Sequence, residues 1–150
     1  MYIKPVTCDE IKKIIINLNE GAPGYDDVTA KCIKCICDNV LEPLVYLTNL
    51  SFNDGIFPCE LKIAKVCPLY KANDSMLFSN YRPISLLSIF SKIYEKLMCN
   101  RLLKFLKKNA ILYKYQFGFQ DNHSTYMALV IMIDNITKAL DKNEYAVGIL

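Results

Sequence analysis

One segment of the chain departs from the helical periodicity that governs the rest. Residues between Lys62 and Tyr70 alternate in a β-like pattern, and Pro68 within them is typical of an edge strand. Tyr81 to Ser85 is suited to return as the second arm of a hairpin. The remaining apolar residues recur mostly at helical spacing, except for a strand-like end from Tyr145 to Leu150. The sequence therefore predicts a helix-rich α+β fold with one short hairpin.

Helices in the first third of the chain are marked by caps and breakers. Thr7 and Glu10 have the form of a capping box, which predicts a helix from about Cys8 to Leu18. Asp26 or Asp27 can cap a second helix that runs through Ile33 and Ile36. A third helix is expected from Val40 to about Phe52, with Pro43 in its first turn and a stop at Asn53-Asp54-Gly55.

Two further helices are expected after the hairpin. The first runs from Leu87 to Lys108, and its apolar stripe shifts halfway, which predicts a break near Cys99 or burial on two sides. Ser124 is a good N-cap for a final helix that extends to about Leu140.

Size and composition indicate one domain, residues 1–150, inside a cell. The chain has 150 residues, of which 53% are hydrophobic and 22% charged, so it can bury a core without disulfides. Its seven cysteines are an odd number without a regular framework, and we expect reduced thiols and an intracellular location. The longest strongly apolar run, Ala128 to Ile133, is too short to cross a membrane.

The short spacing of Cys32-x-x-Cys35-x-Cys37 admits a zinc site, but a second ligand pair is missing, and core packing is the preferred interpretation. His123, beside the expected N-cap Ser124, is assigned to a turn. Tyr25-Asp26-Asp27 has the paired aspartates of a polymerase metal turn, but it follows a Pro-Gly turn and precedes a helix. We therefore assign both aspartates to capping and predict neither a catalytic nor a metal-binding residue.

Positive charge is concentrated in the middle of the chain. Residues 78–120 hold eight lysines and arginines against the single acid Glu95, whereas the whole chain has a net charge of +3. On charge alone, a polyanionic partner and a merely solvated helix surface explain this asymmetry equally well. If the partner is RNA or DNA, we expect weak binding of its backbone, with little sequence preference, by four residues of the long helix: Lys92, Lys96, Arg101 and Lys104.

Three segments in a fixed order together resemble the reverse transcriptase of non-LTR (LINE-type) retrotransposons. The first is Gly24-Tyr25-Asp26-Asp27-Val28, similar to the Pro-Gly-x-Asp segment of that family. The second runs from Leu61 to Lys71 and continues as Asn80-Tyr81-Arg82-Pro83-Ile84-Ser85-Leu86-Leu87, the most specific of the three. The third is Gln116-Phe117-Gly118-Phe119-Gln120 with a closing Ser124-Thr125.

The resemblance implies the fingers and the entrance to the palm of a right-hand polymerase. Lys71 and Arg82 match the basic positions of a fingertip hairpin that grips the deoxynucleotide triphosphate, a task that suits their charge and donors. Three residues resemble the segment that lines the template and nucleotide path: Gln116, Gly118 and Phe119. Gln120 stands where the family usually has Arg.

The resemblance also implies what this chain would lack. Polymerisation in the complete family enzyme needs Mg²⁺ held by aspartates, and Tyr145 to Leu150 resembles the truncated palm strand that leads to the first of them. We expect this chain to bind no cofactor and to synthesise no DNA alone, with the missing palm and thumb as a candidate partner. Two alternatives remain open: a non-catalytic basic nucleic-acid-binding module and a helical interaction protein.

Overall fold

The structure, a computed structural model, describes residues 4–148. The chain falls into two compact units, Met1–Phe105 and Leu106–Leu150, which are described separately. The first unit contains most of the helices and the hairpin, and the second contains the last helix. The fold is α+β and rich in helix, as the sequence predicts.

Helix α1 spans Cys8–Ile16 and begins where the sequence predicts. The Thr7 hydroxyl accepts a hydrogen bond from the Glu10 amide at 3.4 Å, which satisfies one amide of the first turn. The second half of the predicted capping box does not form, because the Glu10 carboxylate instead binds Arg101.

Helix α2 spans Ala30–Cys35, and its N-cap is Thr29, whose hydroxyl accepts from the Cys32 amide at 3.2 Å. The predicted capping by Asp26 or Asp27 is therefore wrong. Asp27 has a φ of 54° in the left-handed region, and Asp26 is bound to another part of the chain. The physical reason is that a Thr one residue before the helix already supplies the oxygen that an N-cap requires.

Helix α3 spans Cys37–Asp54 and ends at Gly55, whose φ of 67° is the left-handed conformation common after helices. The predicted stop is confirmed, but the helix begins at Cys37 rather than Val40. The Ile36 carbonyl accepts from the amides of Asn39 and Val40 and so continues the chain directly into α3. Pro43 consequently lies inside the helix, and its predicted place in the first turn is wrong.

The core of the first unit lies where α1, α2 and α3 meet the start of α4 (Ile89–Lys108). Its fully buried side chains include Ile11, Ile15, Ile33, Ile93 and Leu97. Each comes from an apolar stripe that the helical spacing predicts. Helix α4 is continuous, so the predicted break near Cys99 is wrong. Its buried residues all precede Met98, which also excludes burial on two sides along its length.

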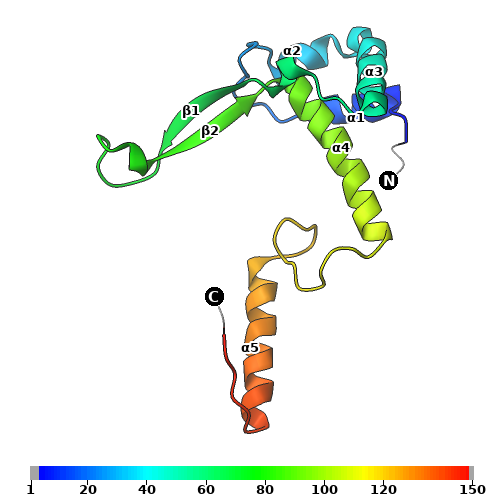
Figure 1. Ribbon diagram of the computed structural model, residues 1–150. Helices are drawn as coiled ribbons and strands as arrows, with labels where there is room; N and C mark the ends of the chain where they lie inside the picture. The colour runs from blue at the N-terminus through cyan, green and yellow to red at the C-terminus, as the bar shows by residue number, and fades with distance from the viewer. Residues whose placement is uncertain (1–3, 149–150) are drawn as a thin grey trace. The chain divides into compact units, whose positions relative to one another are not determined.

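Strands β1 (Ala64–Tyr70) and β2 (Tyr81–Leu87) form an antiparallel pair, which confirms the hairpin. Figure 1 shows this ribbon extending away from the helices of its unit. Two short 3₁₀ turns, Cys59–Lys62 and Phe78–Asn80, precede the strands. The register pairs Leu69 with Arg82 and Tyr70 with Tyr81.

The second unit contains helix α5 (Thr125–Asp141), capped by Ser124, whose hydroxyl accepts from the Met127 amide at 3.3 Å. The predicted N-cap is confirmed. Residues 144–148 have no regular secondary structure, so the predicted strand is absent from the part of Tyr145–Leu150 that the structure describes. Residues 149–150 lie outside the described residues. A strand requires a neighbour to satisfy its backbone groups, and no partner strand pairs with residues 145–148 in the described part of the chain.

Candidate nucleic-acid interface

One face of α4 carries a row of lysines. Lys92, Lys96 and Lys104 are spaced by multiples of four residues, so they share one side of the helix over about 18 Å. All three line a cavity of about 960 Å³ between α1 and α4, to which Lys4 and Lys13 also contribute. Within residues 4–148, none of the three α4 lysines forms an ion pair. We call these three residues the α4 lysine row.

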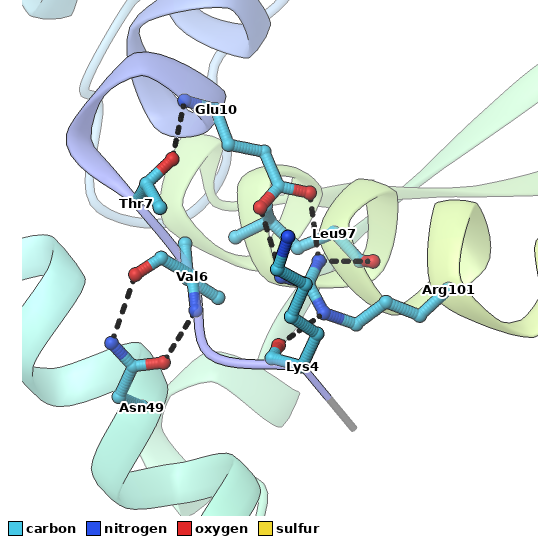
Figure 2. A network of polar contacts seen from close by, with 7 residues as sticks. All are labelled: Lys4, Val6, Thr7, Glu10, Asn49, Leu97 and Arg101. Carbon is cyan, nitrogen blue, oxygen red and sulfur yellow. Dashed lines mark hydrogen bonds and ion pairs between the residues drawn. The ribbon is translucent and has the colours of Figure 1, made fainter. Parts of the chain in front are cut away.

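Arg101 lines the same cavity but is held by other groups (Figure 2). Its guanidinium donates to both carboxylate oxygens of Glu10, at 2.9 and 2.8 Å, and to the carbonyls of Lys4 and Leu97, both at 3.0 Å. It also lies over the ring of Phe52, 5.6 Å from the centroid. With its side chain only 10% exposed, Arg101 joins α1, α3 and α4 and offers little surface to a ligand.

The Arg101 contacts also decide the charge of the cavity. The acids that line it are Asp9, Glu10 and Glu20, and the guanidinium neutralises Glu10. Nearby, Asn49 holds the chain entering α1, since its amide accepts from the Val6 amide at 2.7 Å and donates to the Val6 carbonyl at 3.1 Å (Figure 2). The cavity is therefore lined by more lysines than acids, and the five lysines that line it form no ion pair among the described residues.

Lys71 and Arg82 lie at the distal end of the hairpin, and both are exposed. The Lys71 amide donates to the Asn80 carbonyl at 2.8 Å, which extends the ladder by one pair beyond Tyr70 and Tyr81. Because side chains alternate along a strand, Lys71 and Arg82 point to the same face of the hairpin. The structure thus brings together the two cations that the sequence singles out.

Gln116, Gly118 and Phe119 lie in the loop before α5 and are all exposed. The Gln120 amide donates to the Gln116 carbonyl at 2.9 Å. Phe119, rather than Gly118, has a positive φ, 59°. A Cβ on Gly118 would meet nothing within 4 Å, so no close approach within the described residues requires glycine there.

A contact that the sequence analysis missed links the first family-like segment to Ser88, the residue directly after the second. The Ser88 hydroxyl donates to Asp26 at 2.7 Å and accepts from the Phe90 amide at 3.2 Å, at the start of α4. Asp26 also accepts from the Val28 amide at 3.3 Å. The serine directly before the apolar pattern of α4 is an N-cap signal, but its partner Asp26 lies 62 residues earlier and leaves no local trace.

Gly24 fits tightly against the same junction. A Cβ at Gly24 would lie 2.6 Å from the Ser88 amide nitrogen and 2.8 Å from the Leu87 carbonyl carbon, closer than real Cβ atoms come. The Tyr25 hydroxyl donates to the Glu60 carbonyl at 3.0 Å, just before β1. This segment therefore anchors both ends of the hairpin to the helical part of the unit.

No metal centre is assembled in the part of the chain that the structure describes, where no three Cys, His, Asp or Glu side chains cluster. Cys32 and Cys35 are exposed while Cys37 is buried, so the three do not converge. Both carboxylate oxygens of Asp26 accept hydrogen bonds from the protein, one from the Val28 amide and one from the Ser88 hydroxyl. Within residues 4–148, no helix has both the length and the apolar character to cross a bilayer.

Comparison with known proteins gives the chain its family. It is 33% identical over 148 residues, 97% of its length, to the RNA-directed DNA polymerase from mobile element jockey of Drosophila melanogaster. The chain belongs to the reverse transcriptase family of non-LTR retrotransposons. It is also 33% identical, over 95% of its length, to the probable RNA-directed DNA polymerase from transposon BS of the same fly, and 28% identical over 97% to that from transposon X-element.

The match covers a small part of each relative. The chain spans about 16% of the length of these polymerases, so the family is shown for a segment of them. No protein-family model matches the chain.

Proposed function

We propose that the chain is the template- and nucleotide-gripping part of a reverse transcriptase, formed by the fingers and the entrance to the palm. The observation that carries the proposal is the α4 lysine row, which lines one cavity and forms no ion pair among the described residues. Unpaired ammonium groups along a rigid helix attract phosphates and release their counterions. The row suits the backbone of an RNA or DNA template, which carries one charge per nucleotide.

The sequence predicts that Arg101 binds the nucleic-acid backbone, but in this proposal it has a structural role. Its donors are used by Glu10 and two carbonyls, so it holds α4 against α1 and positions the row. The backbone phosphates are contacted by Lys92, Lys96 and Lys104.

The hairpin supplies the nucleotide contact. Lys71 and Arg82 are exposed cations on one face of a ribbon, and together they offer a mobile point charge and a planar fork of donors. These are the groups that bind the phosphates of a deoxynucleotide triphosphate. Gln116, Gly118 and Phe119 form an exposed loop segment suited to line the template path.

Salt-dependent binding tests the proposal. The variant Lys92→Gln/Lys96→Gln/Lys104→Gln should bind a fluorescent single-stranded RNA more weakly, and its log–log salt slope should be shallower by about 2 units. The matched control Lys12→Gln/Lys31→Gln/Lys138→Gln removes the same charge outside the cavity and should change both quantities much less. Equal losses in the two variants would show that net charge, rather than the cavity, binds RNA.

Catalysis lies outside the proposed role of this chain. Asp26 is engaged in positioning the start of α4, and Mg²⁺ in the complete enzyme would be held by aspartates of the palm. The purified chain should extend no primer on an RNA template with Mg²⁺ present. Extension that disappears in Asp26→Ala would overturn this assignment.

A further inference from the structure

The loop at the end of the hairpin, residues 71–80, is held in one conformation by its own polar groups. Asp74 accepts from the Met76 amide at 2.9 Å through its carboxylate. The Asp74 carbonyl accepts from the Asn80 side chain at 2.7 Å and from the Leu77 amide at 3.3 Å. The loop is therefore organised without a hydrophobic core.

Two tyrosines fix the base of this loop. The Tyr81 hydroxyl donates to the Ser75 carbonyl at 2.9 Å, and the Tyr70 hydroxyl donates to the Asn73 carbonyl. The two rings lie in contact across the register pair, with centroids 5.6 Å apart. One tyrosine from each strand is thus hydrogen-bonded to the backbone of the loop.

The organised loop displays its apolar side chains to solvent. Phe78 is 95% exposed and Met76 is 84% exposed, although the backbone beside each is hydrogen-bonded. Holding an aromatic ring in water on a rigid support brings no stability to this unit. It reduces the entropy that a ligand must overcome to bind against the ring.

The charges of the hairpin identify the ligand. Lys71 and Arg82 lie at the loop end of the hairpin, and the acid of the loop, Asp74, accepts a hydrogen bond from a backbone amide. A polyanion with exposed flat apolar faces matches an aromatic ring among cations, and an unpaired stretch of nucleic acid has both features. A peptide would need acidic and apolar groups in a special order to do the same.

We propose that Phe78 is a stacking platform for an unpaired nucleobase of a single-stranded template. The inference rests on the proposed nucleic-acid function and adds to it a contact with a base, distinct from the phosphate contacts of the lysine row. Stacking is tolerant of sequence because every base has a π-face. The platform therefore adds affinity for single strands over duplexes without adding sequence preference.

Fluorescence provides a direct test because the chain contains no tryptophan. In Phe78→Trp, saturating single-stranded oligo(U) should quench the new indole, and a blunt RNA duplex should not. The control Tyr46→Trp places an indole on α3 at a site that is 68% exposed, where oligo(U) should leave the emission unchanged.

Affinity gives a second measurement. Phe78→Ala should weaken oligo(U) binding by roughly 5- to 150-fold, the range for loss of one stacked base, whereas Phe78→Tyr should retain it. Since Phe78 is almost fully exposed, circular dichroism should be unchanged in both variants. Phe78→Leu keeps an apolar side chain but removes the aromatic ring, so its affinity for oligo(U) should resemble that of Phe78→Ala.

The outcomes separate the platform from the function on which it rests. If the native chain binds oligo(U) with a steep salt slope and Phe78→Ala binds equally well, the platform is wrong and the lysine row stands. If the native chain does not bind nucleic acid at all, both are wrong. Indole emission that shifts with protein concentration alone would show that the loop docks on a second copy of the chain, which also overturns the platform.

Discussion

Helices α1 and α5 begin with the same kind of N-cap but differ in how deeply their side chains are buried. Each begins at a hydroxyl N-cap, Thr7 or Ser124, that accepts from the amide three residues later. In α1 the apolar stripe is fully buried at Ile11 and Ile15, whereas no residue of α5, all of which the structure describes, is buried. Caps thus determine where a helix begins, and only packing against other elements determines what stabilises it.

The largest expected effect is on the free energy of unfolding, when one isoleucine in each unit is replaced by alanine. Ile93 is fully buried in the first unit, and Ile133 on α5 is 62% exposed. Ile93→Ala should lower the free energy of unfolding by about 2–5 kcal/mol, because it leaves a cavity, whereas Ile133→Ala should change it by less than about 0.5 kcal/mol. Urea unfolding followed by circular dichroism measures both. Equal losses would mean that α5 is packed in solution as tightly as α4.

A pair of glycines tests the packing at the start of α4. Gly24→Ala places a methyl group against the backbone at Ser88, and it should cost about 1–3 kcal/mol of unfolding free energy. Gly21→Ala is the control, since a Cβ there meets nothing within 4 Å, and it should be neutral or slightly stabilising. The denaturation midpoints of the two variants measure this difference in stability. Similar midpoints would contradict the tight anchoring of the hairpin.

Features specified by nearby residues could be predicted from the sequence. The Thr7 and Ser124 caps, the stop at Gly55 and the hairpin all depend on contacts within a few residues or across one turn. The α4 lysine row was also predictable, because its spacing places it on one helix face. Whether these residues bind nucleic acid stays a prediction.

Features specified by distant residues could not be predicted. Arg101 and Glu10 form an ion pair although they are 91 residues apart in the sequence. The residues next to each in the sequence do not indicate this pairing. The same applies to Asp26 and Ser88, since two α-helices and the hairpin lie between them along the chain. Tyr145 has strand-like neighbours, but a strand forms only where another supplies its hydrogen bonds.

A smaller effect is expected at Thr48, which with Ser88 and Ser91 is one of the buried polar residues described in the first unit. Its hydroxyl is fully buried and finds no hydrogen-bond partner among the described residues. Thr48→Val keeps the shape and removes the unsatisfied group, so it should raise the unfolding free energy by about 1 kcal/mol. Thr137→Val on exposed α5, where the hydroxyl donates to the Ile133 carbonyl at 3.0 Å, should bring no gain. A loss of stability in Thr48→Val would show that the hydroxyl is satisfied in solution.

The smallest effect is expected where the two units are alike, at their surface ion pairs. Lys138 lies 2.6 Å from Asp134 on α5, and that hydrogen bond, with the attraction of the carboxylate, raises the pKa of Lys138 above its ordinary value of 10.5. Asp38 raises the pKa of Lys12 in the first unit for the same reason. A raised lysine pKa stabilises the folded chain at neutral pH, and this contribution is lost as the pH rises through the folded pKa.

Both lysines are well exposed, so solvent and salt screen these pairs strongly. Asp134→Asn and Asp38→Asn should each lower the unfolding midpoint only slightly at neutral pH. Both differences should vanish once the pH has risen through the raised lysine pKa, or at high salt. Circular dichroism melts at several pH values measure this. A difference that persists at high pH in Asp134→Asn alone would mean that the carboxylate has a partner other than Lys138. The contrast between the two units would then extend from their interiors to their surfaces.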